Sequence, residues 1–249
     1  MMSIVRSEWL KLRTVRSNVT LAIVAILLPL AITLLTAVFI KIRDVDDSTI
    51  PAVLLGSGTM SVLLMGVVGV LVITQEYSQG TIRLTFAATP HRSRVYMAKI
   101  ILLFAVSIVV TSIVQVVGSF GGKAILNSRG FHGAVFNDQT TVAFIAMTIV
   151  GVLVSFLGLA IGTFTRNPPF AITTLVLWPL LIEGIVGGLL SLIFGEHMRT
   201  WLPFSAGLGS MQIRDHFLHL GRWGSVGYFG AWVVGISLIA HTVLRRRDA

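Results

Sequence analysis

The sequence contains no cysteine, which excludes disulfide bonds, thiolate metal sites and cysteine-based redox chemistry. Charged residues are also scarce, at 12% of the 249 residues. A soluble domain carries about 25% charged residues. Hydrophobic residues make up 55% of the chain, and the mean hydropathy is +0.89. This composition argues against a large water-exposed surface, and therefore against a soluble protein.

Apolar runs that are long enough to cross a bilayer recur along the chain. A membrane-spanning helix needs about 20 residues, and the sequence predicts six of them, at residues 19–40, 52–74, 97–119, 140–165, 170–194 and 225–244. The first run is longer than the apolar region of a secretory signal and lacks a convincing cleavage site, so we interpret it as a retained span. No polar stretch is long enough for a separate soluble domain. We expect one membrane domain over residues 1–249.

The basic residues are distributed unevenly between the two sides that six spans define. One set of connections holds twelve basic residues and three acidic ones, whereas the alternate set holds seven basic residues and six acidic ones. Cytoplasmic segments of membrane proteins are enriched in Lys and Arg. The pattern predicts that both termini are cytoplasmic. It also explains the net charge of +9 without a nucleic-acid partner.

The N-terminal arm, residues 1–18, combines an apolar arc with basic residues. On a helical wheel the arc contains Ile4, Val5, Trp9, Leu12 and Val15. Lys11 and Arg13 lie largely off this arc, while Glu8 and Arg16 interrupt the pattern. We expect a helix in the membrane interface, with Trp9 at headgroup depth and the basic side chains toward anionic lipid. The alternative is a positively charged flank that only orients the first span.

A polar stretch, QEYSQGTIRLTFAATPHRSRVYMAK at residues 75–99, separates the second and third spans. The helical spacing of Tyr77, Thr81, Leu84 and Ala88 predicts a short helix, and Gly80 permits either a tight turn or a close approach by another backbone. Thr89 and Pro90 suit the N-cap and first position of the next helix. The spacing alone agrees equally well with a basic loop that only anchors the topology.

This stretch resembles the signature segment of type-2 ABC transporter permeases. In that family an acidic residue, a G-T-[IL]-R sequence, a proline and a basic cluster precede a lysine. The matching positions are Glu76, Gly80, Thr81, Ile82, Arg83, Pro90, Arg92, Arg94 and Lys99. The arm sequence SEWLKLRTVRS and the WLPF sequence at residues 201–204 also resemble segments of that family. The layout of six spans in about 250 residues agrees with the family as well.

The resemblance implies that residues 75–96 form a cytoplasmic coupling helix that docks on a separate ATP-binding cassette subunit. The docking residues would be Glu76, Gly80, Thr81, Arg83, Arg92 and Arg94. ATP and Mg²⁺ would bind to that subunit, so this chain would hold no cofactor of its own. A second permease copy, in a homodimer, would complete the transport path. The expected function is alternating-access export of a lipophilic or amphipathic molecule (a drug, antibiotic or lipid) across a bacterial plasma membrane.

The chain lacks a phosphate-binding loop of the G-x-x-x-x-G-K-[ST] type. The nearest stretch, VGSFGGKA, has Val117 in place of the first glycine and Ala124 in place of the final hydroxyl residue. We therefore expect a transport subunit and not an enzyme. An intramembrane serine protease is disfavoured because Ser57 lacks the required glycine context. An ATP-independent carrier, or an immunity-type membrane protein that binds a partner, remains the alternative.

Several residues inside the predicted spans are candidates for a substrate path. Glu183 is a carboxylate inside a predicted span. Burying such a group in a membrane is energetically unfavourable, so we interpret it as a candidate functional residue. The alternative is that it lies near the outer headgroups. Pro179 should kink the same span, and Gln115 is a polar group in the third span. Glycine pairs at 158/162 and 184/188 are candidate helix contacts in a dimer. The stretch MQIRDHFLHL suggests a short outer helix, and its histidines do not form a metal motif.

These observations predict an all-α integral membrane protein. It would have six transmembrane helices, an N-terminal interfacial helix, a cytoplasmic coupling helix and a short outer re-entrant or amphipathic helix.

Overall fold

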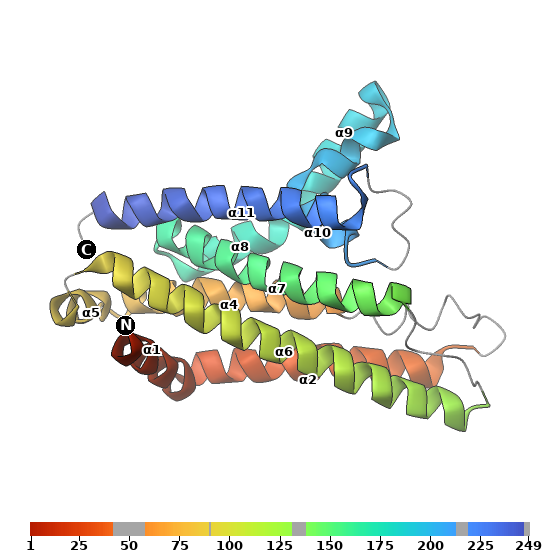
Figure 1. The fold of residues 1–249 in the computed structure, drawn as a ribbon, viewed down its shortest axis with the longest axis horizontal. Helices are drawn as coiled ribbons and strands as arrows, with labels where there is room; N and C mark the ends of the chain where they lie inside the picture. The colour runs from red at the N-terminus through yellow and green to blue at the C-terminus, as the bar shows by residue number, and fades with distance from the viewer. Residues whose placement is uncertain (42–57, 90, 131–137, 213–218, 247–249) are drawn as a thin grey trace.

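The computed structural model describes residues 1–41, 58–89, 91–130, 138–212 and 219–246, and all regular secondary structure among them is helical (Figure 1). Six segments in this described part are long and apolar enough to cross a membrane. They confirm the predicted all-α architecture with six spans. The segments are α2 (Arg16–Phe39), α4 (Gly58–Ser78), α6 (Arg92–Ser128), α7 (Asp138–Thr165), the composite Pro168–Phe194 and α11 (Gly221–Arg246).

Two short helices lie at one end of the bundle, together with both chain termini (Figure 1). Helix α1 (Met2–Thr14) corresponds to the predicted arm, and it is separated from α2 by the extended residue Val15. Helix α5 (Ile82–Ala88) lies between α4 and α6 in sequence. We call this end of the bundle the termini end, and the opposite end the far end.

The junction between α5 and α6 differs from the sequence-based prediction. Thr89 is not the N-cap of the third span but the C-cap of α5, and His91 is the N-cap of α6. A residue before proline is disfavoured in the helical conformation, so α5 ends at Thr89. Thr89 is extended, with φ −135° and ψ 91°. Pro90 itself lies outside the described residues.

Helices α4 and α7 form the centre of the bundle through close backbone contact. A Cβ atom on Gly158 would overlap the carbonyl oxygen of Gly66, and one on Gly69 would overlap that of Ser155. Gly162 faces Ile73 of α4 in the same way. Small residues at this spacing let helices approach closely in a membrane. The glycine pair at 158 and 162 thus joins two helices of the same chain.

The fifth span is interrupted near its middle. It consists of α8 (Pro168–Leu177), a π-helical turn at Trp178–Ile182 and α9 (Glu183–Phe194). Pro179 lies within the π-helical turn, and a proline inside a helix removes a backbone donor and clashes with the preceding turn, which agrees with an interruption here. Figure 1 shows that α9 projects away from the rest of the bundle. A Cβ atom on Gly184 or Gly188 would meet nothing within 4 Å in the described structure.

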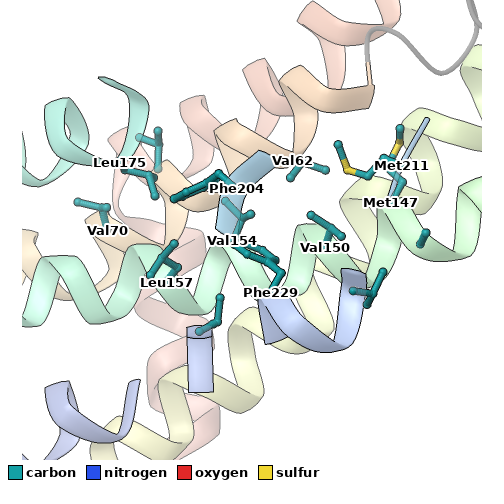
Figure 2. Close-up of a cluster of buried hydrophobic side chains, with 14 of the residues drawn as sticks. Val62, Val70, Met147, Val150, Val154, Leu157, Leu175, Phe204, Met211 and Phe229 are labelled. Carbon is teal, nitrogen blue, oxygen red and sulfur yellow. The ribbon is translucent and has the colours of Figure 1, made fainter. Parts of the chain in front are cut away.

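A buried hydrophobic cluster joins the central helices to the far end. Figure 2 shows Phe204 from α10 (Pro203–Gly209) and Phe229 from α11 among valine and leucine side chains of α4, α7 and α8. The two phenyl ring centroids are 5.4 Å apart. A 3₁₀ helix, η3 (Glu196–Trp201), precedes α10. The short outer helix predicted for MQIRDHFLHL falls largely on residues 213–218, which lie outside the described residues.

Candidate functional site

Helix α5 presents one exposed face at the termini end of the bundle. The chain leaves α4 through a turn in which Gly80 has φ +69°, a conformation that favours glycine. Ile82 then anchors α5, since only 3% of it is exposed. On the other side of the helix Arg83 is exposed, and Leu84 is 71% exposed. An exposed leucine beside an arginine, on a helix fixed from behind, is a surface suited to a protein partner.

Four charged side chains lie behind α5 and form what we call the charge cluster: Glu8, Lys11, Glu76 and Lys99. Lys99 of α6 is at its centre and is completely buried. Its Nζ donates to Oε2 of Glu8 at 2.6 Å and to Oε1 of Glu76 at 2.5 Å. A third donation, at 3.0 Å, reaches the carbonyl oxygen of Val72. All three ammonium protons therefore have an acceptor.

Lys11 of α1 closes the charge cluster from the surface side. Its Nζ lies 2.8 Å from Oε1 of Glu8 and 3.2 Å from Oε1 of Glu76. It also donates to Oγ1 of Thr85 at 3.1 Å, and Thr85 donates to the other oxygen of Glu76, also at 3.1 Å. Because Thr85 belongs to α5, the cluster connects α1, α4, α5 and α6.

The charge cluster is neutral as a whole, with two ammonium groups and two carboxylates. Burying an unpaired charge is very costly, and removing one partner of a buried pair typically costs about 3–5 kcal/mol. The four helix segments are thus held in one arrangement that cannot separate without exposing a charge. Such a connection is suited to moving α5 and the membrane helices together.

Lys11 is protonated, and therefore positively charged, at neutral pH. Burial acts to lower the pKa of Lys11, but the hydrogen bond to Glu8 and the charges of Glu76 and Glu8 outweigh it, so this pKa is raised above its ordinary value. Lys11 therefore stays protonated well into the alkaline range.

Two arginines stack on aromatic rings around the same site. The guanidinium carbon of Arg92 lies 5.0 Å from the ring centroid of Phe86 on α5, and its Nη1 donates to the carbonyl oxygen of Leu244 on α11 at 3.2 Å. Arg166, in the turn after α7, lies 4.8 Å from the ring of Tyr77 on α4. These cation–π contacts tie α5 and the end of α4 to the rest of the bundle.

The structure divides the predicted docking residues into two groups. Gly80, Arg83 and Arg94 are exposed and Thr81 is half-buried, so their role in docking stays a prediction. Glu76 is 8% exposed and directs its carboxylate into the charge cluster, while Arg92 is bonded to α11. In the arm, Trp9 is 46% exposed and Arg13 is exposed, whereas Lys11 belongs to the cluster.

Two members of the charge cluster, Glu8 and Lys99, were not predicted from the sequence. Glu8 seemed only to interrupt an amphipathic arm, yet it is 2% exposed and paired with Lys99. Lys99 was considered only as one of the basic residues that predict the topology and as a position of the family motif. The available signal was its setting in YMAKIILL, because a lysine inside an apolar helix needs a buried partner.

The candidate path residues lie on separate elements. Gln115 of α6 donates from Nε2 to Oγ1 of Thr148 on α7, at 3.1 Å. Glu183 instead caps α10: its Oε1 accepts from the backbone amide of Phe204 at 2.9 Å. Its Oε2 accepts from the amide and the hydroxyl of Ser205, at 2.7 and 3.0 Å. The structure thus gives both residues a role in holding helices together.

A comparison with known proteins gives the chain its family. The model of the family described as "ABC-2 family transporter protein" matches residues 4–194, which include most of α1, the whole charge cluster and α5. No curated protein matches the chain. The chain belongs to the ABC-2 transporter family, and with its six apolar helices it is a multi-pass membrane transport protein.

Proposed function

We propose that this ABC-2 family chain is the permease subunit of an ATP-driven exporter, and that a separate ATP-binding subunit docks on the exposed face of α5. The observation that carries the proposal is the position of α5 in front of the charge cluster. Arg83 and Leu84 are exposed on a helix whose opposite side is bonded through Thr85 to Glu76 and Lys11. A partner that moves α5 would therefore also move α1, α4 and α6.

The termini end is then the cytoplasmic side of a bacterial plasma membrane. The excess of basic residues in the connections at this end supports that orientation. ATP and Mg²⁺ bind to the partner subunit, and this chain supplies the surface that receives the resulting movement. Alternating access follows when that movement tilts the membrane helices against each other.

A second copy of the chain completes the transport path in this proposal. Gly184 and Gly188 on α9 support it, because they lie on a helix that projects from the bundle with nothing from the described chain beside them. The other glycine pair, at 158 and 162, is already used between α4 and α7. A lipophilic or amphipathic cargo agrees with spans that are mostly aliphatic and aromatic.

The proposal is tested by charge reversal on α5. The full-length chain, purified from its host membranes with a mild detergent, should bring down an ATP-binding subunit with Mg²⁺-dependent ATPase activity. Arg83→Glu should lower the amount of recovered ATPase at least fivefold, since one charge-assisted contact contributes about 1.5–3 kcal/mol. Arg245→Glu is the matched control: Arg245 is also exposed at the termini end, on α11, and this variant should behave as wild type.

Recovery of the chain without any ATP-binding subunit, together with full activity of Arg83→Glu in cells, would contradict the proposal. That result would favour an ATP-independent carrier or an immunity-type membrane protein.

A further inference from the structure

A cavity of about 510 Å³ lies between the fifth span and α11, away from the charge cluster. Drug-sized ligands occupy pockets of about 300–1,000 Å³. The inner wall consists of core residues that Figure 2 shows, among them Leu157, Leu175, Phe204 and Phe229. The outer wall comes from α9, η3 and α11. The cavity therefore extends from the π-helical turn to η3 and α10.

Indole and phenol rings form much of the outer wall. Trp178 of the π-helical turn, Trp201 of η3 and Trp232 of α11 are each between 42% and 49% exposed, so their rings are accessible from the cavity. Trp201 and Tyr228 are edge to face, with ring centroids 6.2 Å apart. Aromatic faces attract organic cations, and tryptophan does so best.

The cavity has one formally charged lining residue, Glu183. Both of its carboxylate oxygens accept hydrogen bonds from α10, but in the part of the chain that the structure describes it forms no ion pair. Two other lining polar groups are hydrogen-bonded within the chain: Thr174 donates to the carbonyl oxygen of Phe170, and the Tyr228 hydroxyl donates to that of Trp201. A ligand thus meets apolar surface, aromatic faces and a single negative charge.

We propose that this cavity is a binding site for a hydrophobic organic cation, one whose positive charge is surrounded by apolar or aromatic groups. Its apolar body would replace lipid or water against the tryptophan walls, and its charge would offset that of Glu183. An anion of equal size would meet the same walls but an unfavourable charge. If the proposed export function holds, such cations form one class of cargo, but binding itself requires neither ATP nor the partner subunit.

The test uses two probes of the same size and shape and of opposite charge. Tetraphenylphosphonium and tetraphenylborate are titrated into the purified full-length chain in lipid nanodiscs, with empty nanodiscs subtracted because both ions partition into lipid. Binding is followed by calorimetry and by quenching of tryptophan fluorescence. We expect saturable binding of the cation that is about tenfold or more tighter than that of the anion.

Paired tryptophan variants locate the site. The double variant Trp178→Ala, Trp232→Ala should weaken cation binding at least tenfold. These side chains are half-exposed, so their removal leaves the core intact. The matched control, Trp9→Ala with Trp223→Ala, removes two indoles that do not line the cavity and should bind as wild type.

Three outcomes would overturn the proposal. They are equal affinity for both ions, no saturable binding beyond that of empty nanodiscs, and an unchanged affinity in the Trp178/Trp232 variant. A cavity filled by a lipid tail or by a second copy of the chain would give the second outcome. None of these results bears on the docking of an ATPase at α5, so the two proposals fail separately.

Discussion

The two ends of this molecule bury charge in different ways. At the termini end, two lysines and two glutamates neutralise each other across α1, α4, α5 and α6. At the cavity, the described residues that hold Glu183 are Phe204 and Ser205 of α10, through their backbone amides and the Ser205 hydroxyl. A charge cluster that is complete in itself is suited to fixing helices in place. A carboxylate without a cationic partner is suited to receiving one from a ligand.

The largest expected effect follows from removing the central cation of the cluster. Lys99→Met should lower the free energy of unfolding by about 3–5 kcal/mol, because among the described residues it leaves two buried carboxylates with Lys11 as their one cationic partner. Thermal or denaturant unfolding in detergent measures this. Arg94→Met is the control, since Arg94 lies on the same helix but is exposed, and it should change stability by less than about 0.5 kcal/mol.

If Lys99→Met lowered the free energy of unfolding by less than Arg94→Met, the cluster would not depend on its central ammonium group. That result would contradict the proposed difference between the two ends. Adding Glu76→Gln to Lys99→Met should recover part of the lost stability, since one of the unpaired charges is removed.

An intermediate effect is expected at the cavity. Glu183→Gln removes a charge that no described residue pairs with, so it should cost only about 1–3 kcal/mol, the range for a buried donor left without an acceptor. Hydrogen exchange should show the loss at the amides of Phe204 and Ser205, which donate to this carboxylate. The preference of the cavity for tetraphenylphosphonium over tetraphenylborate should fall at the same time. If Glu183→Gln lowered the free energy of unfolding as much as Lys99→Met, the proposed difference between the two buried charges would be contradicted.

The smallest effect concerns pH. The pKa of Lys11 is raised in the folded chain, mainly through Glu8 and Glu76 acting against burial. A raised pKa gives stability that is fully present below the unfolded pKa, about 10.4 for lysine, and is lost as pH rises through the folded value. The stability difference between wild type and Lys11→Met should therefore be constant from pH 7 to about 9 and shrink only above about 10.4. A difference that shrinks below pH 9 would contradict this assignment.

The sequence was sufficient to predict the six spans, because the length of an apolar run is fixed by bilayer thickness. A helix in the arm was also predicted correctly, whereas the helix predicted from Tyr77 to Ala88 is shorter in the structure, since Tyr77 belongs to α4 and α5 begins at Ile82. Details that depend on the packing of helices could not be predicted from the sequence. Glu8 appeared to interrupt an amphipathic pattern, and only the contact of α1 with α6 shows its partner, Lys99. Thr89 was wrongly assigned as an N-cap, because the extended conformation that the next proline favours suits both an N-cap and the end of a preceding helix.

The candidate sites, too, could be predicted only in part from the sequence. Arg83 could be placed on an exposed helix face from the family motif, whereas Glu76 in the same motif lies inside the charge cluster. A motif records which residues occur together but not which way each side chain points. The cavity could not be predicted either, because its tryptophans come from residues 178, 201 and 232, which only the bend of the fifth span and the position of η3 bring together.

The docking of an ATPase on α5 is tested most directly by a photo-crosslinking amino acid at Leu84, which is 71% exposed on that helix. Irradiation of intact host cells should join the chain to a protein that contains a G-x-x-x-x-G-K-[ST] motif, identified by mass spectrometry. The same probe at Phe120, which is 59% exposed on α6 away from the termini end, should not. A crosslink from Leu84 only to lipid, or equal capture of the ATP-binding protein from both positions, would contradict the account.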